Sequence, residues 1–135
     1  MAAASGVGTC MIQLCKMAGV DTIAISSSPT KLEKCMELGS FSSVNYKQYP
    51  FYSDVVTLIT DGEGVDVIFD PILGTFFNCN LKCLGYDSRW VIYDAMGGEM
   101  KDVPQNLMKL LGKRASIMTS SLRDKTNAYK RGLIE

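Results

Sequence analysis

The sequence predicts an α/β protein of the doubly wound type, in which helices cover both faces of a parallel sheet. Short β-rich stretches alternate with helical apolar patterns along all 135 residues, an order typical of parallel sheets. A glycine-containing loop opens the chain and leads directly into the first helical pattern. The composition is 47% hydrophobic and 21% charged, which suits one globular domain with a buried core.

The opening loop, residues 1–9, consists of small residues around Gly6 and Gly8. It continues into a helix expected over residues 6–18, whose apolar side chains recur at helical spacing. Small residues let a backbone approach a phosphate, and the helix then directs free N–H groups and its positive dipole end toward it. The loop lacks the first glycine of the full G-x-G-x-x-G motif, so by itself it is compatible with a phosphate site and with a plain tight turn.

The rest of the chain repeats strand and helix in order. We expect strands over residues 21–25, 43–46, 65–70, 89–93 and 115–119. We expect helices over residues 31–38 (after an N-cap at Ser28 and Pro29 in the first turn), from residue 50, over 74–84, over 104–111 and from about residue 124.

The glycine loop of such a fold follows the strand at the centre of the sheet. Here at most residues 1–4 can belong to that strand, and the last helix runs to Glu135. We therefore expect residues 1–135 to form a single domain, truncated at both ends, that lacks most of its first central strand.

The composition bounds the possible functions. Fourteen basic and fourteen acidic residues balance, which gives no electrostatic footprint for nucleic acid or an anionic membrane. The chain has no histidine, so it cannot supply Ser-His or Cys-His catalysis or a His-based zinc site. Its five cysteines lie within apolar patterns and are expected to be reduced core thiols, as in a cytoplasmic protein.

A set of short motifs, in order along nearly the whole chain, gives the sequence a family likeness. These motifs are Ala4-Ser5-Gly6-Val7-Gly8-Thr9, Ile12-Gln13-Leu14, Lys31-Leu32, Glu37-Leu38-Gly39, Val44-Asn45-Tyr46, Gly64-Val65-Asp66-Val67, Asn80-Leu81-Lys82-Cys83-Leu84, Arg89-Trp90-Val91, Met96-Gly97-Gly98, Lys113-Arg114-Ala115-Ser116 and Ser121-Leu122-Arg123. With them the chain resembles the cofactor-binding domain of the zinc-free quinone oxidoreductases. These enzymes are medium-chain dehydrogenase/reductase relatives of zeta-crystallin, and the likeness is closest to the p53-inducible quinone reductase type.

The resemblance implies a Rossmann-like fold and a dinucleotide (NADPH)-binding domain over residues 1–135, without the family's catalytic barrel-like domain. It also implies hydride transfer from NADPH to a quinone or an α,β-unsaturated carbonyl, with the nicotinamide carrying the hydride and no catalytic residue in this chain. The place that holds a carboxylate in NAD-preferring relatives is here Ser26-Ser27-Ser28 with Lys31 after it. A hydroxyl and an ammonium suit a 2′-phosphate, which favours NADPH over NADH.

The same resemblance implies the cofactor-binding residues. Ser5, Gly6 and Val7 would approach the pyrophosphate, Ser28, Lys31 and Tyr46 would surround the adenosine phosphate, and Ile72, Met96 and Gly97 would line the nicotinamide side. Two positions depart from the family pattern: Leu73 and the Asp94-Ala95 pair.

The family also pairs its last strand across a two-fold axis, so a homodimer through Ala115–Ser121 is expected. The expected partners are then a second copy and a small quinone-like substrate, with no nucleic acid and no membrane. A second interpretation stays open, in which the chain is a non-catalytic nucleotide-binding or dimer-forming remnant with no turnover of its own.

Overall fold

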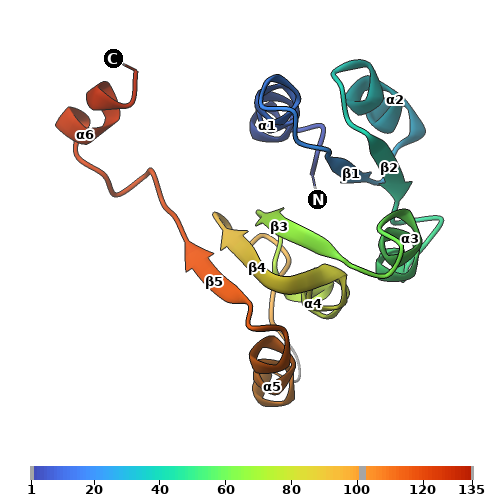
Figure 1. Ribbon diagram of the computed structural model, residues 1–135. Coiled ribbons are helices and arrows are strands. Elements are labelled where there is room, and N and C mark those ends of the chain that lie inside the picture. Colours follow the sequence, from blue (N-terminus) through green and yellow to red (C-terminus); the bar gives the residue numbers. More distant parts are fainter. Residues whose placement is uncertain (1, 101–102, 135) are drawn as a thin grey trace.

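The computed structural model describes residues 2–100 and 103–134. Its strands and helices alternate as the sequence predicts (Figure 1). The strands are β1 (Ile23–Ser26), β2 (Ser42–Asn45), β3 (Val65–Asp70), β4 (Leu84–Ile92) and β5 (Ser116–Thr119). The helices are α1 (Gly6–Met17), α2 (Pro29–Glu37), α3 (Tyr52–Ile59), the 3-10 turn η1 (Gly74–Phe76), α4 (Phe77–Cys83), α5 (Val103–Lys113) and α6 (Asn127–Gly132).

The strands form two parallel sheets, β1-β2 and β3-β4-β5. In the first, Ile25 lies opposite Val44; in the second, Trp90 lies between Ile68 and Ile117. Every pairing within the described residues is parallel, which confirms the predicted sheet type.

Two expected elements differ from the structure by more than two residues. The last helix, expected from about residue 124 to the end of the chain, spans only Asn127–Gly132. β4 begins at Leu84, five residues before the expected strand. The helix expected over 74–84 is divided into η1 and α4 and ends at Cys83. Gly85 packs against the backbone of Glu63, where a Cβ would come within 2.8 Å of the carbonyl oxygen. Because the chain is extended where Gly85 meets Glu63, β4 pairs with β3 already at Leu84, which lies opposite Val65. The pairing register between β3 and β4 then shifts between Val65 and Val67.

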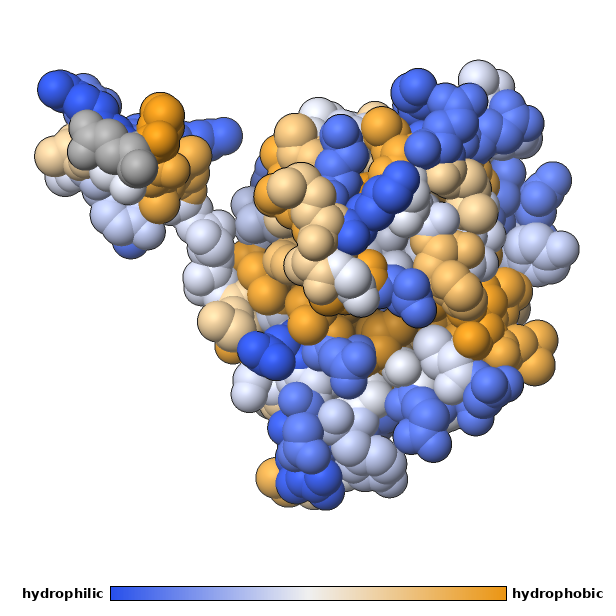
Figure 2. Space-filling view, turned by 45° about the horizontal axis from the view of Figure 1, so that its top comes forward, coloured by the Kyte–Doolittle hydropathy of each residue, from blue (hydrophilic) through white to orange (hydrophobic). Residues whose placement is uncertain are grey.

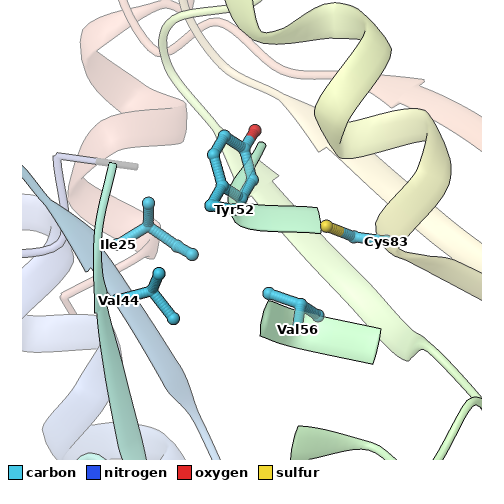
Figure 3. Packing of buried hydrophobic residues seen from close by; sticks show 5 residues of the cluster. All are labelled: Ile25, Val44, Tyr52, Val56 and Cys83. Carbon is cyan, nitrogen blue, oxygen red and sulfur yellow. The ribbon is translucent and has the colours of Figure 1, made fainter. Parts of the chain in front are cut away.

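Buried clusters lie on both faces of β1. One cluster comprises Ile25, Val44, Tyr52, Val56 and Cys83, from β1, β2, α3 and α4 (Figure 3). The other comprises Ile12, Ala24, Leu32 and Cys35, from α1, β1 and α2. Ala24 and Ile25 are successive residues of one strand and so point to opposite faces. Helices therefore cover both faces, and the doubly wound Rossmann-like arrangement is confirmed.

A third cluster packs α4 and α5 against β4. It comprises Phe77, Leu81, Leu84, Trp90 and Leu110. The ring of Trp90 is fully buried and lies 5.0 Å, centroid to centroid, from that of Phe77. Ile68 of β3 packs against both this cluster and the cluster around Ile25 and Val44, so it joins the cores of the two sheets.

An apolar cavity of about 630 Å³ separates the two sheets and is lined by β1, β3 and α1. β1 pairs only with β2 and β3 only with β4 among the described residues, so the edges that face the cavity lack a strand. The Ala3 N–H donates to the Ile25 carbonyl, 3.3 Å away, at the β1 edge. Residues 2–5 form a turn rather than a strand. The sheet is thus divided where we expected most of the first central strand to be missing; Met1 lies outside the described residues.

After β5, which is the edge strand of the second sheet, the chain leaves the sheets. All four residues of β5 are exposed, and α6 stands apart from the body of the molecule (Figures 1 and 2). Figure 2 also shows apolar side chains gathered in the middle of the body's visible face. In the described part of the chain, every helix is too short or too polar to cross a membrane.

The five cysteines are free thiols but do not all lie in the core. Cys35 and Cys83 are buried, whereas Cys10 is exposed, so the expected core position of Cys10 is wrong. The sequence pattern of α1 predicts which residues share a face of the helix. It does not predict whether another element packs on that face. Burial raises the pKa of Cys35, and burial with the nearby Cys79 raises that of Cys83 to about 12.

We expect the thiols to differ in reactivity accordingly. At about pH 8, a maleimide should label Cys10 within minutes and Cys35 and Cys83 only after denaturation, because thiolate and access are both required. The raised pKa of Cys83 also makes the stability of the fold depend on pH. Its contribution is fully present below pH 9.0, the pKa of the thiol in the unfolded chain, and is lost as the pH rises toward about 12, its pKa in the folded chain. Mass spectrometry of pulse-labelled chain measures both effects, and fast labelling of Cys83 in the folded chain would contradict them.

Candidate functional site

The glycine loop forms the N-terminus of α1 beside the carboxyl end of β1. Ser5 is the N-cap, and its Oγ accepts a hydrogen bond from the Gly8 N–H at 3.1 Å. A Cβ at Gly8 would lie 2.3 Å from the Ala3 carbonyl oxygen, whereas one at Gly6 would meet nothing within 4 Å. Gly8 is therefore required for packing, and Gly6 leaves open space in front of the helix. The first-turn amides of Gly6 and Val7 have no intrahelical acceptor, which suits an approaching anion.

The predicted phosphate-binding lysine faces the same region. A cavity of about 380 Å³ is lined by Ala4 and Thr9 from the glycine-loop side and by Lys31 from α2. Lys31 is exposed and takes part in neither of the ion pairs found among the described residues, Lys34–Glu37 and Arg114–Asp87. Glu33, Lys34 and Glu37 also line this cavity. The structure thus brings Ala4, Thr9 and Lys31 to one cavity, which Ser5, Gly6, Val7, Ser28 and Tyr46 do not line.

Ser28 and Tyr46 follow the carboxyl ends of β1 and β2. Ser28 is the N-cap residue of α2, as predicted, but its side chain makes no capping hydrogen bond. Its hydroxyl therefore remains available to another acceptor or donor. The Tyr46 N–H donates to the Ser26 carbonyl at 3.1 Å, and its ring packs edge-on against Phe76 with 5.0 Å between centroids. Parallel strands place these two loops at the same edge of the sheet.

The residues expected on the nicotinamide side come together through their backbones. The Gly97 N–H donates to the Ile72 carbonyl at 2.6 Å, and the Met96 N–H donates to the Pro71 carbonyl at 3.2 Å. A Cβ on Gly97 would lie 2.6 Å from the Ile72 carbonyl oxygen, so only glycine fits there. The loops after β3 and β4 therefore form one unit, and the side chain of Met96 is exposed on it.

The departures from the family pattern lie in this unit as well. Leu73 has φ 56° and ψ −124°, a conformation that costs a non-glycine residue about 1 kcal/mol or more. Asp94 is exposed, and one of its oxygens accepts a hydrogen bond from the Ala95 N–H at 2.8 Å. No described contact couples Asp94 to Ile72 or Gly97.

Sequence reasoning missed the buried group beneath these loops. Asp70 is completely buried at the end of β3 and accepts hydrogen bonds from Asn80 and Trp90. Periodicity marks Asp70 only as the end of a strand and cannot show that its carboxylate has partners far along the chain. The Asp70-Pro71 pair at the end of an apolar strand was the available signal, since an Asp there often binds the amides of a following turn.

A parallel sheet wrapped on both faces, with a glycine loop and strand-end loops at one edge, defines the NAD(P)-binding Rossmann class of domain. The chain belongs to the zinc-binding dehydrogenase family, whose sequence profile matches residues 6–135. In the described residues, no group of three or more His, Cys, Asp or Glu is placed to hold a metal ion.

Similar proteins include a quinone oxidoreductase-like protein and a haloacrylate reductase. Quinone oxidoreductase-like protein 2 of Bos taurus is 34% identical over 110 residues, which is 81% of this chain and 31% of the relative. The 2-haloacrylate reductase of a Burkholderia species is 32% identical over 116 residues, 86% of this chain and 34% of the relative. The chain therefore spans about a third of the length of these relatives, and the predicted resemblance is confirmed.

Solved structures show the same fold. Escherichia coli quinone oxidoreductase complexed with NADPH has a TM-score of 0.72 and 26% identity, over 88% of this chain and 35% of that one. An NAD-dependent alcohol dehydrogenase has a TM-score of 0.81 and 27% identity, over 95% of this chain and 36% of that one. Neighbours thus include proteins named for each cofactor, so the choice between NADPH and NADH depends on the residues of this chain.

Proposed function

We propose that the chain is the NADPH-binding domain of a quinone oxidoreductase-like enzyme. The enzyme would transfer hydride from NADPH to a quinone or an α,β-unsaturated carbonyl. The observation that carries this proposal is the cavity that Ala4 and Thr9 share with Lys31. The Ser28 hydroxyl, which is not used as a helix cap, adds a second polar group at the start of the same helix as Lys31. The Bos taurus, Burkholderia and Escherichia coli proteins described above support the reaction class.

The residues present fit the cofactor in three parts. The Gly6 and Val7 amides, beside the Ser5 cap, would hold the pyrophosphate, because nothing fills the space in front of Gly6. Ser28, Lys31 and Tyr46 would hold the adenosine end with its 2′-phosphate.

At the other end of the cofactor, Ile72, Met96 and Gly97 would orient the nicotinamide and exclude water from one of its faces. NADPH supplies the hydride when bound, and this chain supplies binding and orientation.

Replacing Lys31 with alanine should weaken NADPH binding by about 1–3 kcal/mol and leave NADH binding unchanged, because only NADPH carries the 2′-phosphate. Cofactor fluorescence titration measures both affinities. Lys109→Ala, an exposed lysine on α5, is the matched control and should change neither. Equal losses for the two cofactors would contradict the 2′-phosphate assignment, and no binding by the unaltered chain would contradict the proposed function.

We further propose a homodimer through Ala115–Ser121. β5 pairs with β4 on one side, and all four of its residues are exposed, so its outer edge can pair with a second copy. Light scattering at high concentration should give the mass of a dimer, and Met118→Lys, which places a charge in the middle of β5, should shift it toward the monomer. A monomer at every concentration would contradict the proposal.

The free thiols support a cytoplasmic location, where cysteines stay reduced. The alternative of a nucleotide-binding remnant without turnover predicts NADPH binding but no quinone-dependent NADPH oxidation, which the same titration and a simple absorbance assay distinguish.

A further inference from the structure

The loops that we place at the nicotinamide rest on one buried carboxylate. Asp70 Oδ1 accepts the backbone N–H groups of Ile72 and Leu73, at 2.8 and 2.9 Å. Asp70 Oδ2 accepts from Asn80 Nδ2 at 2.8 Å and from Trp90 Nε1 at 3.0 Å. All four partners are donors, which matches a carboxylate that only accepts. No lysine or arginine is among these partners, so the hydrogen bonds alone replace the water lost on burial.

The two ends of this carboxylate hold different parts of the molecule. Oδ2 is attached to the core, because Asn80 and Trp90 are both buried. Oδ1 is attached to the loop after β3, where Leu73 keeps the unfavourable φ of 56°. The carboxylate thus ties a strained loop to the rigid core, and strain of this kind persists only where the surroundings enforce it.

The side chain of Asn80, which donates to Asp70, is itself held by the hydroxyl of Tyr52. The Tyr52 hydroxyl donates to Asn80 Oδ1 at 2.7 Å, which leaves the Asn80 amide nitrogen to face Asp70. Burial raises the pKa of Tyr52 far above its usual value, so the phenol keeps the proton it donates.

The loop after β3 is tightly packed against the loop after β4. The Thr75 N–H donates to the Gly97 carbonyl at 3.2 Å, in addition to the Gly97–Ile72 bond described above. A Cβ on Gly74 would lie 2.2 Å from the Gly97 carbonyl oxygen. A displacement of Ile72 therefore moves Gly97 with it.

We propose that Asp70 is a positioning residue for cofactor binding, which sets the Ile72 and Gly97 loops for the nicotinamide half of NADPH. The inference rests on the proposed function, and it adds a residue that touches no cofactor itself. The proposal assigns different residues to the two halves of NADPH. Asp70 affects binding of the nicotinamide half, and Lys31 with the glycine loop affects binding of the adenosine half.

The test variant is Asp70→Asn, which keeps the shape but turns an NH₂ group toward donors in either orientation of the amide. NADPH affinity should fall about tenfold, whereas the affinity for 2′,5′-ADP, which lacks the nicotinamide half, should change less than about twofold. Asp66→Asn lies on the same strand and is exposed, so it should change neither affinity. Parallel losses of both ligands, or an unchanged NADPH affinity in the folded variant, would overturn the proposal.

A measurement without ligand keeps the proposal testable if Asp70→Asn folds poorly. Trp90→Phe removes a single donor to Oδ2 and retains an aromatic ring. In both variants amide hydrogen exchange at Ile72, Leu73 and Gly97 should accelerate, with exchange in α2 unchanged; unchanged exchange at all three amides overturns the proposal. If the unaltered chain binds neither NADPH nor 2′,5′-ADP, the proposed function fails, while the exchange measurement still decides whether Asp70 holds the loops.

Discussion

An apolar segment of about five β-branched residues, inserted between Met1 and Ala2, should raise the free energy of unfolding by about 3 kcal/mol. The added residues would enter the cavity of about 630 Å³ between β1 and β3, parallel to both strands. The hydrogen bond from Ala3 to Ile25 sets the direction of entry. Burial of the new side chains and of the cavity lining would exceed the entropy lost by ordering the extension. Urea unfolding followed by Trp90, the single tryptophan, measures the gain.

The matched control is a glycine–serine extension of the same length, which offers backbone but no apolar side chains. It should leave stability within about 0.5 kcal/mol of the unextended chain, as is usual for exposed changes. Hydrogen exchange should slow in β1 and β3 only with the apolar extension, because only it pairs with their free edges. Equal stability of the two extended chains would show that the cavity does not accept a strand.

Replacing Trp90 with alanine should cost about 4 kcal/mol of folding free energy. The indole is fully buried against Phe77, and its removal leaves a void and takes away one of the two donors to Asp70 Oδ2. Such a loss is a large part of the stability of a domain of this size. Circular dichroism during thermal unfolding measures it without requiring tryptophan.

Two variants on the same strand separate the contributions. Trp90→Phe keeps an aromatic ring but loses the hydrogen bond to Asp70, and should cost about 1–2 kcal/mol. Tyr86→Ala lies on β4 with 66% of Tyr86 exposed, and should cost less than about 1 kcal/mol. A Trp90→Ala chain as stable as Tyr86→Ala would contradict the central place of Trp90 in this core.

Local patterns explain why much of the fold was predictable. The run Val65–Asp70 is a strand because β-branched residues end at a proline, and Ser28 with Pro29 marks the start of α2. Both signals lie within a few residues of the feature they predict. The early start of β4 at Leu84 was not predictable in this way, because it depends on Gly85 packing against Glu63.

The same distinction applies to the candidate site. Lys31, Tyr46, Ile72 and Gly97 were found by family likeness, which supplied positions but no contacts. The amino-acid sequence by itself determined the order of strands and helices, the parallel sheet they form and the absence of histidine chemistry, since these follow from local pattern and composition.

Only the tertiary structure decided that Asp70 is held by donors from Ile72, Leu73, Asn80 and Trp90. Only it showed that an apolar cavity lies where the central strand was expected to be missing. The bonds from Asn80 and Trp90 join groups that are distant in the chain and meet only when the core packs, and no local pattern encodes such a meeting.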